Sequence, residues 1–164
     1  PGQFMPAVEK GVREVLQSGA IAGYPVVDVK VIVYDGKHHS VDSKEIAFVT
    51  AARKAFAAAI RAARPIVLEP IVHIEIGAPD AAMGDITGDL SSKRGQVNGT
   101  HNGAAGTMLV RGQVPMSELN GYQSRLNAMT SGQGRYTITL SHYEAVPPAV
   151  QQQLIAAHQV HDEE

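Results

Sequence analysis

The spacing of hydrophobic residues divides the first part of the chain into two helices and a strand. Apolar residues recur at helical intervals over 6–18 and over 45–63, and Ser43 is placed to cap the second helix. Between the helices, residues 26–33 are mostly valine and isoleucine, the β-branched composition of a buried strand. The polar residues 37–42 then predict a loop that connects the strand to the second helix.

The second part of the chain has a different pattern, in which strands outnumber helices. Residues 72–76 alternate between apolar and polar side chains, as expected for a strand with one exposed face. The next segments follow in the order helix, strand, strand, helix and strand, over 80–93, 96–100, 107–114, 117–129 and 136–140. A short helix should follow, beginning at Pro147-Pro148 and ending at about Ala157. This βαββαβ order predicts a ferredoxin-like domain, and the change of pattern near residue 70 divides the chain into domains 1–69 and 70–164.

The composition narrows the class of protein. With 164 residues, 44% of them hydrophobic, the chain has enough apolar mass for one domain or two small ones. The absence of cysteine excludes disulfides, thiolate catalysis and cysteine-ligated zinc, and fits a reducing compartment. No apolar run approaches the roughly 18 residues that a membrane span needs, and no secretory pattern is present. We therefore expect neither export nor membrane binding.

Charge is distributed unevenly along the chain. Residues 1–70 hold nine basic and seven acidic side chains, whereas residues 71–164 hold five and nine, which gives the net charge of -2. The basic residues of the first part gather around the predicted loop and second helix, at Lys37, Lys44, Arg53, Lys54, Arg61 and Arg64. Such a cluster suits contact with nucleic-acid phosphates, although a solvated helix face would have the same composition.

The predicted loop carries the candidate binding residues Lys37, His38, His39, Ser40 and Asp42. Histidine can stack, donate hydrogen bonds and change charge near neutral pH, so this loop suits contact with RNA. An ordinary solvated turn is the alternative. No metal site is predicted, because adjacent histidines point in different directions and no third ligand stands at a useful spacing.

The second part of the chain offers weaker candidates for chemistry. Asp85 and Asp89 are four residues apart, and Lys93 follows Asp89 at the same interval, which favours a helical ion pair over acid–base chemistry. The glycine-rich residues 98–106 do not lead from a strand into a helix, and the sequence contains no Walker-type phosphate loop. Because no nucleophile-elbow serine is present either, we predict no catalytic residue in this chain.

Several motifs, taken in order along the chain, resemble elongation factor G, a family of translational GTPases, or its close paralogue elongation factor G 2. They are Gly23-Tyr24-Pro25-Val26, His38-His39-Ser40-Val41-Asp42-Ser43, Glu45-Ile46-Ala47-Phe48, Leu68-Glu69-Pro70, Gly84-Asp85-Ile86-Thr87-Gly88-Asp89-Leu90, Lys93-Arg94-Gly95, Val114-Pro115-Met116-Ser117-Glu118-Leu119-Asn120-Gly121-Tyr122 and Gln133-Gly134-Arg135-Tyr136. The resemblance extends over nearly the whole chain, and its ending at 141–148 is more similar to the paralogue.

The resemblance implies an α/β (α+β) fold of two small two-layer sandwiches. Residues 1–69 would be the C-terminal part of domain IV, an incomplete βαβ unit like domain 2 of ribosomal protein S5. Residues 70–164 would be the ferredoxin-like βαββαβ domain V with a C-terminal helix. Because the opening strands of domain IV would precede Pro1, we expect an uncovered sheet edge and non-physiological self-association of the fragment.

The resemblance also implies a function. The chain would be the ribosome-binding portion of a cytoplasmic GTPase that promotes tRNA–mRNA translocation, with rRNA, tRNA and stalk-base proteins as partners. GTP and Mg²⁺ would bind missing N-terminal domains, which are further partners in cis. His39 aligns with the family's loop histidine, and Lys93 and Arg94 become candidate rRNA contacts. The alternatives are a ribosomal-protection factor of the tetracycline-resistance type and a free-standing RNA-binding module.

Overall fold

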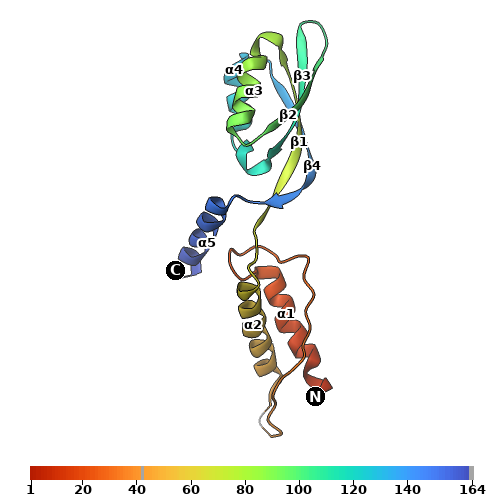
Figure 1. The fold of residues 1–164 in the computed structure, drawn as a ribbon, viewed down its shortest axis with the longest axis vertical. Helices are drawn as coiled ribbons and strands as arrows, with labels where there is room; N and C mark the ends of the chain where they lie inside the picture. Colours follow the sequence, from red (N-terminus) through yellow and green to blue (C-terminus); the bar gives the residue numbers. More distant parts are fainter. Residues whose placement is uncertain (42, 163–164) are drawn as a thin grey trace. The chain divides into compact units, whose positions relative to one another are not determined.

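The computed structural model describes residues 1–41 and 43–162 and divides into two compact units (Figure 1). The first unit combines Pro1–Val67 with the segment that follows Val146, and the second spans Leu68–Val146. The division lies close to the boundary expected near residue 70. The C-terminal helix falls within the first unit. The Gln151 side chain of this helix accepts a hydrogen bond from the Val67 amide at 2.9 Å and donates to the Pro65 carbonyl at 3.3 Å.

Helices dominate the first unit. Its elements are η1 (Gly2–Phe4), α1 (Met5–Ser18), α2 (Glu45–Ala62) and α5 (Pro148–Asp162). The helices α1 and α2 lie side by side, and Val15, Phe56 and Ile60 form the centre of their contact. Gly11 allows the two backbones to approach closely, because a β-carbon at this position would lie 2.3 Å from the Val49 carbonyl oxygen. Both helices were predicted from their hydrophobic spacing.

The predicted strand over 26–33 is not formed, although residues 24–35 connect α1 to the loop before α2 as a mostly extended segment. The Val26 amide donates to the Leu16 carbonyl at 2.7 Å, but the described residues provide no neighbouring strand for the rest of the segment. Asp28, with φ of 57°, also interrupts its extended course. The strand prediction is therefore wrong, because a strand requires a partner for its backbone hydrogen bonds. Ile32 and Tyr34 are consequently 66% and 93% exposed.

The second unit has the predicted βαββαβ order. Its main elements are β1 (Leu68–Pro79), α3 (Met83–Ser92), β2 (Gln96–Asn102), β3 (Thr107–Pro115), α4 (Tyr122–Thr130) and β4 (Arg135–Ala145). The strands form an antiparallel sheet in the order β2-β3-β1-β4, and α3 and α4 cover one face of it (Figure 1). The α+β class and the ferredoxin-like arrangement are confirmed.

The core of the second unit lies between the sheet and the two helices. Ile74, Ile76, Ile86, Val110 and Leu126 are each no more than 2% exposed, which accounts for the alternating pattern of the strands. Both predicted helices begin later than expected, after the short 3-10 segments η2 (Asp80–Ala82) and η3 (Met116–Leu119). The second helix starts only at Tyr122 because Gly121 adopts a left-handed conformation with φ of 69°.

Candidate nucleic-acid interface

The loop between the extended segment and α2 brings most of the predicted contact residues together. Lys37, His38, His39 and Ser40 follow one another on this loop and are all exposed. Asp42, the fifth predicted residue, lies outside the described residues. At the entrance of the loop, the Gly36 amide donates to the Asp35 carboxylate at 2.8 Å.

Local hydrogen bonds hold the backbone of the loop around His39. The His39 amide donates to Ser43 Oγ at 2.8 Å, and the same hydroxyl donates to the His39 carbonyl. The Val41 amide donates to His39 Nδ1 at 3.3 Å, so the neutral ring carries its proton on Nε2. Ser43 therefore closes the loop and does not cap α2 as predicted: Lys44 stands at the N-cap position, with no capping bond from its side chain.

The basic side chains near the loop divide into two groups. Lys37, Lys44 and Lys54 are exposed, and each can present its charge to solvent. Arg53 binds Glu14 of α1 at 3.0 Å, and Arg61 donates to the Ala20 carbonyl at 3.3 Å. The cluster expected from sequence is therefore partly used to hold α2 against the rest of the first unit.

In the second unit, Arg94 forms a network of internal ion pairs. Its guanidinium contacts both carboxylate oxygens of Glu69, at 2.5 and 3.1 Å, and Glu118 at 3.1 Å. Ser117 Oγ also donates to Glu69 at 3.3 Å. The hydrogen bond to Glu69 raises the pKa of Arg94 above its ordinary value despite partial burial, and Glu118 adds to this effect. No local pattern indicates Glu69 or Glu118, because both pairs join residues at least 24 positions apart.

Lys93, the other candidate rRNA contact, forms the predicted helical ion pair with Asp89. Its Nζ lies 3.4 Å from Asp89 Oδ1, and Arg125 Nε on α4 approaches the same oxygen at 3.0 Å. Arg125 was not predicted, since nothing local to it indicates a carboxylate on another helix. Asp89 is buried and Asp85 is exposed, so the two carboxylates do not share one environment.

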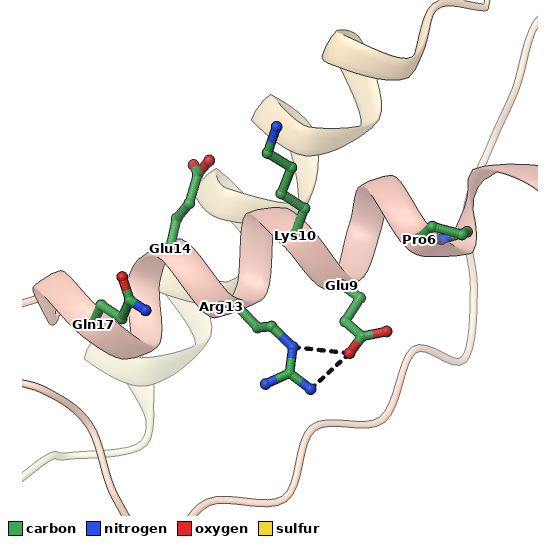
Figure 2. Close-up of a pocket in the computed structure, with 6 residues that line it drawn as sticks. All are labelled: Pro6, Glu9, Lys10, Arg13, Glu14 and Gln17. Carbon is green, nitrogen blue, oxygen red and sulfur yellow. Dashed lines mark hydrogen bonds and ion pairs between the residues drawn. The ribbon is translucent and has the colours of Figure 1, made fainter.

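Surface depressions lie along α1 and on the sheet of the second unit. The first lies along α1, where Pro6, Glu9, Lys10, Arg13, Glu14 and Gln17 line an open face and Arg13 pairs with Glu9 at 2.7 Å (Figure 2). The second lies on the sheet, lined by His73, Ile74, Glu75, Asn98, Arg111, Gly112, Thr137 and Thr139. Neither assembles an acid, base and nucleophile. The described part of the chain groups no three potential metal ligands, and its helices include none long and apolar enough to cross a membrane.

Comparison with known proteins gives consistent matches along the chain. A family model described as elongation factor G C-terminus matches residues 66–154, and one described as elongation factor G, domain IV, matches residues 1–64. An elongation factor G-like protein of Thermotoga maritima is 43% identical over 155 residues, covering 94% of this chain and 23% of that protein. A crystal structure from Thermus thermophilus matches with a TM-score of 0.77 at 36% identity, covering 97% of this chain and 24% of that one. The chain thus spans about a quarter of the length of these relatives.

Proposed function

Because the chain belongs to the elongation factor G family, we propose that it is the ribosome-binding C-terminal portion of a GTPase that promotes movement of tRNA and mRNA. The observation that carries this proposal is the match of both family models, in order, over 1–64 and 66–154. In this proposal the protein acts in the cytoplasm, and GTP and Mg²⁺ bind N-terminal domains of the parent protein. The described residues of this chain do not fit GTP or Mg²⁺, since they include no strand-to-helix phosphate loop and no cluster of metal ligands.

The exposed loop around His39 would be the part that contacts tRNA and rRNA. Lys37 and His38 supply donors for phosphates and bases, and the hydrogen bonds from Ser43 to the His39 backbone limit the freedom of the loop before binding. A loop ordered in advance loses less conformational entropy when it binds. Its action would be mechanical, because it occupies space beside the tRNA after movement and so hinders return.

The second unit would contact rRNA and the proteins of the stalk base. Lys93 remains a candidate for a phosphate contact, because Asp89 also pairs with Arg125 and the three side chains together carry one excess positive charge. Arg94 is less available, since Glu69 and Glu118 already bind its guanidinium. An RNA contact by Arg94 would require it to give up hydrogen bonds within the unit.

Substitution of His39 in the full-length parent tests the role of the loop. We expect His39→Ala to slow tRNA movement roughly tenfold or more, the value of one hydrogen bond to a charged group, while GTP hydrolysis stays nearly unchanged. Arg13→Ala is the matched control, because Arg13 is exposed on α1 and pairs locally with Glu9. Equal loss of both rates would contradict a contact role for His39.

A parent gene without a Walker-type loop upstream would instead support a free-standing RNA-binding module, and release of tetracycline from stalled ribosomes would support a protection factor.

A further inference from the structure

The hydroxyl of Ser43 lies where it could serve either of two neighbouring structures, the contact loop or the helix α2. Ser43 precedes Glu45, the first residue of α2, by two positions, and serine is a preferred residue for capping a helix at this boundary. Lys44 nevertheless occupies the N-cap position, with an extended backbone and no capping hydrogen bond from its side chain. The side chain of Ser43 bonds backwards along the chain, to His39. The helix therefore begins without a cap that the sequence could provide.

Ser43 uses its hydroxyl both as an acceptor and as a donor toward one residue. Its Oγ accepts from the His39 amide at 2.8 Å and donates to the His39 carbonyl. These two groups belong to the peptide planes on either side of the His39 Cα, so fixing both of them restricts φ and ψ of His39 together. The direction in which the imidazole leaves the backbone is restricted with them. Ser43 thus orients His39.

Burial contributes little to the order of this part of the chain. Residues 37–41 are all exposed, and the side chain of Val41 is 82% exposed. A segment with few buried contacts opens easily, so hydrogen bonds decide how much of the time it spends in one conformation. A capping serine typically stabilises a helix by a factor of about five in the folding equilibrium. Directing the Ser43 hydroxyl to the loop forgoes this gain and orders an exposed imidazole instead.

We propose that Ser43 is a positioning residue for the contact between His39 and RNA. Its hydroxyl holds the backbone of the loop, so that the imidazole meets the RNA in the binding conformation, and Ser43 itself does not touch the RNA. This inference rests on the proposed function of the loop. Because a loop ordered in advance loses less conformational entropy when it binds, removal of the hydroxyl should weaken the step that His39 serves and leave the other steps unchanged.

Hydrogen exchange measured by NMR on the chain tests the two hydrogen bonds without reference to function. We expect the His39 amide to exchange roughly three- to tenfold faster in Ser43→Ala than in the parent, and Ser43→Thr, which keeps the hydroxyl, to restore the protection. Ser18→Ala is the matched control, because Ser18 Oγ donates to the Glu14 carbonyl at 3.0 Å within α1 and the change removes a serine–backbone bond from the same unit. An unchanged exchange rate of the His39 amide in Ser43→Ala would overturn the proposal.

Rates measured with the full-length parent test the positioning role. We expect Ser43→Ala to slow tRNA movement roughly three- to tenfold, with GTP hydrolysis nearly unchanged, and Ser43→Thr to restore the rate of movement. In a His39→Ala background, Ser43→Ala should have no further effect, because the side chain that it positions is absent. Equal slowing in both backgrounds would indicate a general structural effect and would overturn the proposal.

The role of Ser43 and the role of the loop fail in different ways. If His39→Ala slows tRNA movement and Ser43→Ala does not, the loop keeps its contact role and only the role of Ser43 is refuted. If His39→Ala leaves the rate of movement unchanged, the proposed contact by the loop is itself refuted, and the positioning role is refuted with it.

Discussion

Replacing Arg94 with alanine should destabilise the second unit, because the change leaves a buried carboxylate without its main partner. The Glu69 side chain is 8% exposed and receives both terminal nitrogens of Arg94, at 2.5 and 3.1 Å. After the substitution, Ser117 Oγ at 3.3 Å would be the remaining donor to this carboxylate among the contacts that the structure describes. Glu118 would also lose a partner, but it is itself about one-third exposed and can be hydrated.

The size of the effect follows from the burial of the two partners. Breaking a buried ion pair from one side costs about 3–5 kcal/mol. The Arg94 side chain is 34% exposed, so water can enter where the guanidinium was and partly solvate Glu69. We therefore expect a loss of about 2–3 kcal/mol, at or just below the lower end of this range. For a unit of this size, such a loss lowers the melting temperature by roughly 10–20 °C.

The backbone at Arg94 provides an internal control for this experiment. Arg94 has φ of 57°, a conformation that favours glycine, so Arg94→Gly removes the same ion pair while relieving about 1 kcal/mol of strain. The glycine variant should therefore be more stable than the alanine variant, and Glu69→Gln combined with Arg94→Ala should recover much of the loss. Circular dichroism during heating, with amide resonances of the second unit followed by NMR, measures these differences. An alanine variant within about 0.5 kcal/mol of the parent would refute the argument.

The remaining predictions concern titration, self-association and helix packing. The pKa of Tyr122, raised by burial, favours the folded state while the phenol is neutral. Its contribution to the free energy of unfolding should be complete below pH 10 and lost as pH rises through about 12. The Tyr122→Phe variant should lack this part of the alkaline loss of stability. The isolated chain should self-associate through its exposed extended segment, and Val29→Thr with Ile32→Thr should weaken this association in sedimentation velocity more than Ile66→Thr, an equally exposed site elsewhere. Gly11→Ala should separate α1 from α2 and cost about 1–3 kcal/mol in urea unfolding, and an unchanged midpoint would contradict the close helix contact.

The elements of the second unit could be predicted because their signals are local. A sheet with one covered face places apolar residues at alternate positions, as at Val72, Ile74 and Ile76. The helices that cover this face belong to the same unit, so the pattern is complete within it. The ion pair of Lys93 with Asp89 was predictable for the same reason, since both lie four residues apart around one helix. Wherever a contact joined distant segments, as for Arg94 with Glu69, the sequence contained no period or spacing that could indicate it.

The extended segment before the loop shows that β propensity alone does not determine a strand. Residues 26–33 have strong β propensity, and the sequence alone therefore predicted a buried strand. Propensity describes how well side chains fit a sheet, but the stability of a strand comes from backbone hydrogen bonds and from burial against a second layer. Among the described residues, Val26 bonds to Leu16 and packs against the core of the first unit, but no neighbouring strand pairs with the segment, and Ile32 stays two-thirds exposed. The loop that follows keeps its own geometry because Ser43 and Val41 bond to His39 within five residues. The candidate contact loop is therefore locally determined even where the element that leads into it is not.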